Sequence, residues 1–233
     1  EYKVITGTND PLMGTMTPPT GTYRFDSLLT LTAKANPGYR FKEWSDHGSA
    51  LNPRDYRVEA VNDTVIKAVF EPDEFRVRVQ SEDINKGKVT PNGQAKYPYL
   101  SSVDMTAIPE PGYTFAGWSD GETGLNRTYT VEAVQDTTFT AYFKADNFLV
   151  RTKANESKMG SVTPKTDYYE FGQSLLLTPE ANLGYEFVQW SDGNTDNPRE
   201  YIVEAVKPDT TFTAIFKASQ FPLRPRVNNP DWG

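Results

Sequence analysis

The sequence predicts an all-β fold that is built from three copies of one small module. The chain has 233 residues, and aromatic side chains make up 13% of it, against 37% for all hydrophobic side chains. Threonine, valine, tyrosine and phenylalanine, which favour strands, are frequent, while 17 prolines and 16 glycines supply turns. Several motifs also return at a fixed interval. Together these observations favour short strands that are joined by tight turns.

Four separate motifs mark the repeat. A glycine followed by Tyr-x-Phe-x-x-Trp-Ser-Asp occurs at Gly38, Gly112 and Gly184; a Thr-Pro pair ends at Pro18, Pro91 and Pro164; Val-Glu-Ala-Val spans 58–61, 131–134 and 203–206; and a closing phenylalanine falls at 70, 143 and 216. Because four separate motifs return at intervals of 72 to 74 residues, the sequence predicts tandem modules. Their predicted bounds are 1–72, 73–145 and 146–218, followed by a tail at 219–233.

Strands within each module are predicted from side chains that alternate between apolar and polar. In the second module such runs begin at Phe75, Val103, Tyr129 and Phe139, with Gly, Pro, Asn and Asp between them. No window of ten or more residues shows a helical stripe. Each of the three repeated tryptophans follows a phenylalanine by three residues, which would place it on the wrong face of a regular strand. We therefore predict a β-bulge that turns the indole inward.

The repeated aromatic side chains are predicted to form the core of each module, because a chain of about 73 residues has little interior and needs large apolar groups. They are Tyr39, Phe41 and Trp44 in the first module, Tyr113, Phe115 and Trp118 in the second, and Tyr185, Phe187 and Trp190 in the third. The alternative is a platform of exposed rings that binds sugars. Better candidates for such ligand contacts are aromatic residues that differ between modules, namely Tyr97, Tyr99, Tyr168 and Tyr169.

The combined motif resembles the internalin B-repeat family, in its divergent branch that is common in Bacteroidetes. The resemblance is carried by Gly-Tyr-x-Phe-x-x-Trp-Ser-Asp-Gly, then Asn-Pro-Arg, Tyr-x-Val and a closing Asp-Thr-Thr-Phe-Thr-Ala-x-Phe, and it extends over all three modules. It implies β-grasp-like modules along bacterial cell-surface proteins, with roles in adhesion, interaction or spacing, and it supplies no catalytic residues. The departures are local: His47 and Ile66 in the first module, and Asn126-Arg127 without the proline in the second.

Composition excludes several kinds of chemistry. The chain has 24 basic and 31 acidic residues, a net charge of −7, which does not favour a nucleic-acid partner. Zero cysteines exclude disulfides and thiolate metal sites, and a single histidine excludes a histidine-rich metal site. No apolar stretch approaches the ~18–20 residues that span a membrane. We expect no cofactor, no nucleic acid and no transmembrane segment.

Three features carry potential chemistry, and each has a simpler structural interpretation. Ser45-Asp46-His47 contains the residue types of a catalytic triad, but adjacency in sequence is not triad geometry, so His47 is predicted to lie in a surface turn. Asp46, Asp120 and Asp192 recur once per module, which favours a turn over a glycosidase pair. The segment 192–196 begins like a calcium loop, but Asn197 and Val203 replace its glycine and glutamate. A weak calcium site there stays as an alternative.

Three arginines, Arg54, Arg127 and Arg199, recur nine or ten residues after the tryptophans. An arginine at a fixed distance from both an aspartate and a ring is able to bond the carboxylate or to stack on the ring. Because each module keeps one, we predict that they serve the fold.

As a whole, the sequence favours a non-enzymatic, extracellular region of a bacterial cell-surface protein that spaces or presents a binding element. Its expected partner is a protein or a glycan, and the isolated chain is expected to be a monomer. The alternatives are carbohydrate binding by exposed aromatic rings and an accessory segment of a glycan-active protein. Linkers of four residues, 71–74 and 144–147, predict an end-to-end rod on the order of 90 Å long. The proline-rich tail is predicted to run extended.

Overall fold

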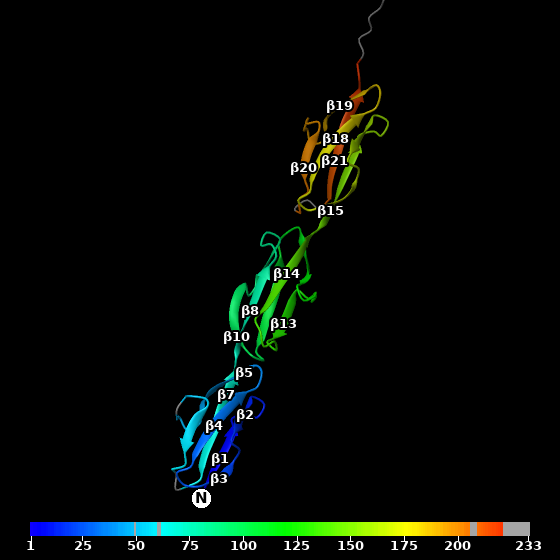
Figure 1. Cartoon of the computed structure of the whole chain (residues 1–233). Helices are drawn as coiled ribbons and strands as arrows, with labels where there is room; N and C mark the ends of the chain where they lie inside the picture. Colours follow the sequence, from blue (N-terminus) through cyan, green and yellow to red (C-terminus); the bar gives the residue numbers. More distant parts are fainter. Residues whose placement is uncertain (49, 60–61, 206–208, 221–233) are drawn as a thin grey trace, which may run out of the picture. The chain divides into compact units, whose positions relative to one another are not determined.

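A computed structural model describes residues 1–48, 50–59, 62–205 and 209–220. These residues form twenty-one strands and no helix, so the predicted all-β fold is confirmed. The strands group into three pairs of sheets, one pair for each repeat (Figure 1). The chain divides into two compact units, one containing 1–108 and 115–142, the other containing 109–114 and the residues from 143 onward.

The first repeat has a four-stranded sheet in the order β3-β1-β7-β5 and a three-stranded sheet in the order β2-β4-β6. The strands are β1 (Tyr2–Thr8), β2 (Gly14–Thr17), β3 (Gly21–Tyr23), β4 (Leu28–Ala35), β5 (Tyr39–Trp44), β6 (Arg54–Arg57) and β7 (Thr64–Pro72). The first and last strands pair in parallel at the centre of the larger sheet, and the other pairs are antiparallel. A central parallel pair of first and last strands is the sheet order of a β-grasp fold, and a second sheet accompanies it here.

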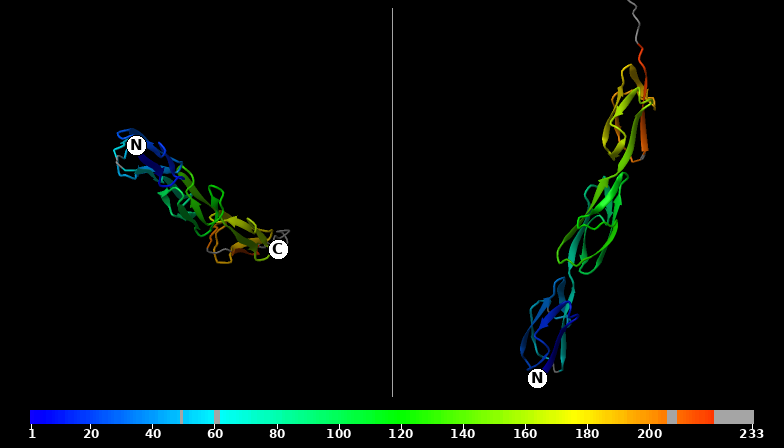
Figure 2. Two further views of the ribbon diagram at one scale, coloured as in Figure 1. Left: turned by 90° about the horizontal axis from the view of Figure 1, so that it is seen from below. Right: turned by 90° about the vertical axis from the view of Figure 1, so that its right-hand side faces the viewer.

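The second and third repeats form the same two sheets, which Figure 2 shows from two further sides. In the second repeat the strands are β8 (Glu74–Ser81), β9 (Gly87–Thr90), β10 (Gly93–Pro98), β11 (Ser102–Pro109), β12 (Tyr113–Trp118), β13 (Asn126–Thr130) and β14 (Thr137–Ala145). In the third they are β15 (Asn147–Ala154), β16 (Gly160–Thr163), β17 (Asp167–Glu170), β18 (Ser174–Ala181), β19 (Tyr185–Trp190), β20 (Arg199–Ile202) and β21 (Asp209–Ala218). The parallel central pairs are β8 with β14 and β15 with β21.

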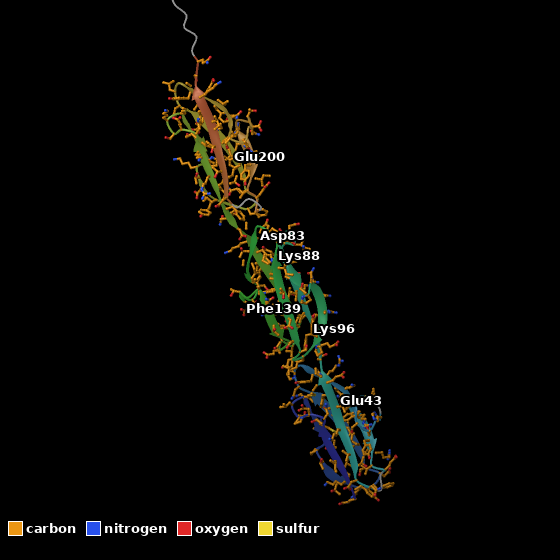
Figure 3. All side chains as sticks on the ribbon, turned by 180° about the vertical axis from the view of Figure 1, so that it is seen from behind. Glu43, Asp83, Lys88, Lys96, Phe139 and Glu200 are labelled. Atoms are coloured by element: carbon orange, nitrogen blue, oxygen red, sulfur yellow. The ribbon has the colours of Figure 1, made fainter. Side chains whose placement is uncertain are left out.

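Each repeat has a hydrophobic core of its own. In the first, Leu31 and Trp44 belong to one buried cluster, and in the third, Leu177 and Trp190 belong to another that shares no residue with it. In the second repeat Phe139 of β14 is buried (Figure 3). The cores draw on both sheets of their repeat: in the first repeat, Leu31 comes from β4 of the smaller sheet and Ile66 from β7 of the larger one.

A register shift in the strand before each turn brings the tryptophans into these cores. The pairing of β5 with β7 shifts between Phe41 and Glu43, and that of β19 with β21 shifts between Phe187 and Gln189. In β12 the equivalent position is Gly117, with a φ of +145°. One extra residue returns the following indole to the buried face, which confirms the predicted bulge in β5 and β19.

Two sequence predictions fall partly outside the described residues. The predicted extended tail lies there from residue 221 onward, and the Val-Glu-Ala-Val runs include residues 60–61 and 206. Within the described part of the chain, no helical segment has the length and apolarity that a membrane crossing requires.

Candidate functional site

The most regular polar arrangement is a turn that joins a tryptophan, an aspartate and an arginine in every repeat. The indole N–H donates a hydrogen bond to a backbone carbonyl of the turn: Trp44 to Leu51, Trp118 to Gly124 and Trp190 to Asp196, each at 2.9 Å. The guanidinium bonds the aspartate after the tryptophan: Arg54 with Asp46 at 2.5 Å, Arg127 with Asp120 at 2.6 Å and Arg199 with Asp192 at 2.7 Å. Two interactions therefore hold the turn, one from the indole N–H and one from the guanidinium.

Each guanidinium also lies over an aromatic ring. The distances to the ring centroids are 5.1 Å for Arg54 over Trp44, 4.7 Å for Arg127 over Phe139 and 4.9 Å for Arg199 over Phe212. In the first repeat, Ile66 stands where the others have the phenylalanine, and Arg54 faces the indole instead. The arginines therefore have both predicted roles, because they bond the aspartate and stack on a ring.

In the second and third repeats these ion pairs lower the pKa of the turn aspartate. The hydrogen bond from Arg127 holds the pKa of Asp120 below its ordinary value, against the opposing effect of partial burial. At Asp192, partial burial favours a higher pKa, but hydrogen bonds from Arg199 and from the backbone N–H of Asn194 outweigh it, so the pKa is lowered. A general acid needs a raised pKa. Neither carboxyl group has the electrostatics of a proton donor.

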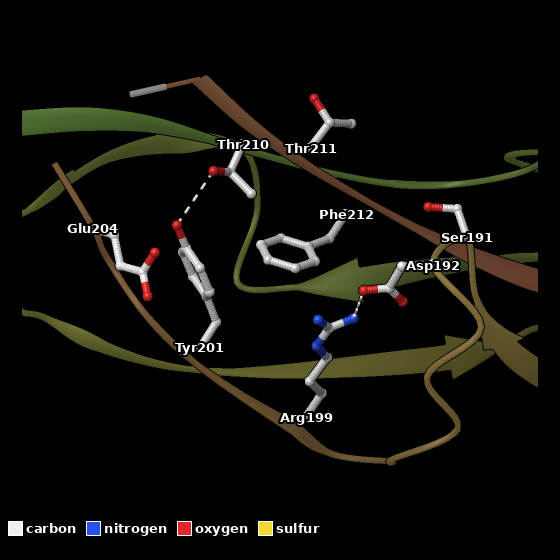
Figure 4. Close-up of a pocket in the computed structure, with 8 residues that line it drawn as sticks. All are labelled: Ser191, Asp192, Arg199, Tyr201, Glu204, Thr210, Thr211 and Phe212. Carbon is white, nitrogen blue, oxygen red and sulfur yellow. Dashed lines mark hydrogen bonds and ion pairs between the residues drawn. The ribbon is translucent and has the colours of Figure 1, made fainter. Parts of the chain in front are cut away.

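A shallow cavity of about 340 Å³ in the third repeat contains one of these pairs (Figure 4). Its lining consists of Ser191, Asp192, Arg199, Tyr201, Glu204, Thr210, Thr211 and Phe212. The Arg199 guanidinium points at Asp192, and the Tyr201 hydroxyl shares a hydrogen bond of 3.2 Å with the Thr210 hydroxyl. Of its two carboxylates, Asp192 is committed to Arg199. The lining therefore does not offer the two available carboxylates that glycoside hydrolysis requires.

The loop with calcium-like spacing uses its oxygens within itself. The Asp192 carboxylate accepts the backbone N–H of Asn194 at 3.2 Å, the Asn194 side-chain amide donates to the Asp196 carboxylate at 3.1 Å, and the Asp196 N–H donates to Asn194 Oδ1 at 2.8 Å. Among the described residues, no group of three or more His, Cys, Asp or Glu side chains is placed to hold a metal ion.

His47 and Ser45 are not brought together as a catalytic pair. The Ser45 hydroxyl accepts the backbone N–H of Lys67 at 2.8 Å, whereas His47 Nδ1 lies 3.9 Å from the Glu43 carboxylate. The His47 side chain is exposed, on a backbone with a φ of +54°. A serine nucleophile needs a base within hydrogen-bond reach, and the contacts of Ser45 and His47 do not provide it.

The four tyrosines that were candidates for ligand contact lie in different surroundings. Tyr97 is half-buried, and Tyr99 packs edge-on against Tyr39, with ring centroids 5.3 Å apart. Tyr169 is half-buried, its hydroxyl donates to a backbone carbonyl at 2.6 Å, and burial raises its pKa. Tyr168 is 65% exposed. Of the four, Tyr168 presents the largest accessible ring.

Tyr99 belongs to a contact between the first two repeats that the sequence analysis missed. The N–H of the linker residue Asp73 donates to the Gly38 carbonyl at 2.8 Å, and the N–H of Tyr99 donates to the Asp73 carbonyl at 2.8 Å. The Tyr99 ring also lies 6.4 Å from that of Phe75. The linker, the glycine loop of one repeat and a ring of the next are therefore bonded together.

The same contact recurs inside the second compact unit. The Asp146 N–H donates to the Gly112 carbonyl at 2.9 Å, the Phe171 N–H donates to the Asp146 carbonyl at 2.8 Å, and the rings of Tyr113 and Phe171 lie 5.3 Å apart. A sequence signal exists for it, since an aromatic-x-aromatic pair occurs at residues 23 and 25, 97 and 99, and 169 and 171.

Fold and site together define a tandem β-repeat protein whose repeated polar residues hold turns. The chain matches the divergent InlB B-repeat domain at residues 5–74, 77–147 and 150–220. The chain therefore belongs to the divergent InlB B-repeat family, as its motifs predicted. This family is a repeat domain associated with cell-surface proteins.

One solved structure that is similar to the chain is the Bacillus anthracis TIE protein. The sequences are 10% identical, the TM-score is 0.45, and the match covers 94% of this chain and 51% of that one. The chain thus spans about half the length of that protein.

Proposed function

We propose that these repeats are a non-enzymatic, extracellular part of a bacterial cell-surface protein, and that they space or present a binding element. The observation that carries this proposal is that the residues common to all three repeats serve the fold. Trp44, Trp118 and Trp190 are buried with their N–H groups bonded, and their partner arginines bond the turn aspartates. Residues committed in this way are not presented to a substrate.

The linker contacts support a spacing role. A flexible linker lets neighbouring modules rotate against each other. A linker whose backbone is hydrogen-bonded to the glycine loop of one repeat and to the backbone of an aromatic residue of the next restricts that rotation. Asp73 and Asp146 make both bonds. A partner protein or glycan would then contact residues that differ between repeats, and the isolated chain would remain a monomer.

Small-angle scattering of the whole chain tests the spacer. We expect a monomer with a largest dimension on the order of 90 Å, since three globules of about 30 Å would lie end to end. The matched variant Tyr99→Ala removes a linker contact and should broaden the distribution of distances. A compact particle, with all repeats clustered, would contradict the proposal.

Carbohydrate binding is a second candidate, and the exposure of Tyr168 favours it. An accessible ring stacks on a sugar face, and the ring lies on β17 of the third repeat. A glycan array followed by calorimetric titration would show binding that Tyr168→Ala abolishes and that Tyr142→Ala, which removes another exposed ring, leaves unchanged. Absence of binding to every glycan would eliminate this candidate.

A further inference from the structure

The contact between consecutive repeats has two halves, and each half has a distinct chemistry. One half is the glycine loop, Gly38 or Gly112, which directly precedes the strand that ends at the tryptophan. The other half is the docking ring, Tyr99 or Phe171, which follows the third strand of the next repeat. The linker aspartate bonds the two halves through its N–H and its carbonyl.

The docking ring sits where a side chain on the loop would be. A Cβ on Gly38 would lie 2.6 Å from atoms of the Tyr99 ring, and a Cβ on Gly112 would lie 2.6 Å from atoms of the Phe171 ring. Both glycines also have a positive φ, +86° and +88°, which side-chain-bearing residues rarely adopt. These loop positions are glycine for two independent reasons: the backbone has a positive φ, and the docking ring occupies the space of a side chain.

The third repeat has the same loop at Gly184. Its φ is +87°, and the Ser219 N–H donates to the Gly184 carbonyl at 2.9 Å, as the linker aspartates do in the other two repeats. In the described part of the chain, however, nothing lies within 4 Å of the position of a Gly184 Cβ. The neighbouring Leu183 is 99% exposed. The loop therefore has the conformation of a ring-binding loop and an open surface.

The first repeat has a docking ring in Phe25. Phe25 packs edge-on against Tyr2 with centroids 6.3 Å apart, which corresponds to the 6.4 Å between Tyr99 and Phe75 in the second repeat. Phe25 is 60% exposed, whereas Tyr99, covered by the glycine loop, is half-buried. The first repeat therefore exposes the half of the contact that the third repeat lacks.

We propose that the Gly184 loop binds the docking ring of another repeat of this fold, and that Phe25 of a second copy of this chain fits it. The two internal contacts support this choice of occupant. The conformation of the Gly184 loop, the hydrogen bond to its carbonyl and the position of the Phe25 ring each correspond to a feature of those contacts. The contact is heterologous, so linked repeats would add in one direction, head to tail. One loop and one ring make too small an interface to hold separate chains together, so the isolated chain stays a monomer and the contact forms where two copies are joined. The inference rests on these contacts and stands whether or not the region is a spacer.

A tandem protein tests the proposal, with Ser219 of one copy joined directly to Glu1 of a second whole copy. Four residues then separate Phe216 from Tyr2, the same number that separates Phe70 from Phe75. When the Phe25 ring covers the loop, its ring current should move the Gly184 Hα resonances upfield, toward those of Gly38 and Gly112. Hydroxyl radicals should label Phe25 of the second copy less than they label Phe25 of the single chain.

Two variants serve as matched controls. In the single chain, Tyr99→Ala should move the Gly38 Hα resonances toward the position of Gly184 and so calibrates the shift. In the tandem protein, Phe25→Ala in the second copy should abolish the Gly184 shift without unfolding, because Phe25 is an exposed residue. The proposal is overturned if the tandem protein keeps the Gly184 resonance of the single chain, or if Phe25→Ala leaves a shifted resonance in place.

Discussion

Each repeated tryptophan is stabilised by two separate interactions, burial of its ring and a hydrogen bond from its N–H. Trp190 is fully buried, and its N–H donates to the Asp196 carbonyl. We predict that Trp190→Ala lowers the free energy of unfolding of the third repeat by about 3–5 kcal/mol, through the cavity that it leaves. Urea titration followed by backbone NMR measures this change. Tyr168→Ala, at an exposed position, should change it by about 0.5 kcal/mol or less.

The pairing of Asp120 with Arg127 gives stability a dependence on pH. The pKa of Asp120 is lowered in the folded state, so its contribution is complete above the ordinary aspartate pKa of about 4 and is lost as pH falls through the folded-state pKa. Between about pH 5 and pH 2 the urea midpoint of the second repeat should decrease. Asp120→Asn should flatten that decrease, whereas Glu132→Gln, at another exposed carboxylate, should not.

Residues that recur in all three repeats could be predicted from the sequence, whereas residues that are replaced in one repeat could not. The arginine–aspartate turn was foreseen because it recurs in all three repeats. Asn9 was not foreseen, although its side chain accepts the N–H of Phe70 and donates to the Phe70 carbonyl, both at 2.9 Å. Asn155 does the same with Phe216, but Glu82 stands at this position in the second repeat. The partners are also 61 residues apart in sequence, beyond any local pattern.

At the scale of elements, the Asn155 side chain fastens the end of β15 to β21. Aspartate in its place accepts the Phe216 N–H but has no donor for the Phe216 carbonyl, so a half-buried acceptor loses its partner. We predict that Asn155→Asp costs about 1–3 kcal/mol of the stability of the third repeat. Denaturant unfolding checks this value. Asn147→Asp, the same chemical change at the exposed start of β15, should have little effect.

The glycine loop before β5 couples the first two repeats. Gly38→Ala would place a Cβ 2.6 Å from the Tyr99 ring at a φ of +86°, so the loop and the ring must separate. The Asp73 amide, which donates to the Gly38 carbonyl, should then exchange with deuterium faster. Gly7→Ala is the matched control, because nothing lies within 4 Å of its Cβ position. Unchanged exchange of Asp73 in Gly38→Ala would show that the coupling is absent.

The strands themselves were predictable because alternation of apolar and polar residues reveals which residues face the core. The bulge before Trp44 and Trp190 followed from the same alternation, since a three-residue step violates it. Strand partners were not predictable, because periodicity carries no information on neighbours. The parallel pairing of Val4 with Thr64 closes a long loop and depends on the topology of the whole repeat.

At the scale of the whole molecule, the repeated motifs identified the family but did not reveal the contact between repeats. The docking rings Phe25, Tyr99 and Phe171 have the same spacing as Trp44, Trp118 and Trp190, so they belong to the repeat. Their identity, however, changes from Phe to Tyr, and nothing in the spacing says that each ring contacts the preceding repeat. That contact is recognised only once the Gly38 and Gly112 loops are placed in space.

The parallel pairing of β1 with β7 determines how a repeat resists mechanical tension. The chain enters at the start of β1 and leaves at the end of β7, so a pull on both termini loads their hydrogen bonds in shear, all at once. Pulling between Tyr39 and Pro72, which are paired at one end of the antiparallel β5–β7 ladder, would instead open that ladder bond by bond. In single-molecule pulling we expect the terminal attachment to require the higher unfolding force, because forced unfolding follows the barrier and not the equilibrium stability. In a chain of such repeats, tension applied at the two ends would load the parallel pair of every repeat in the same way.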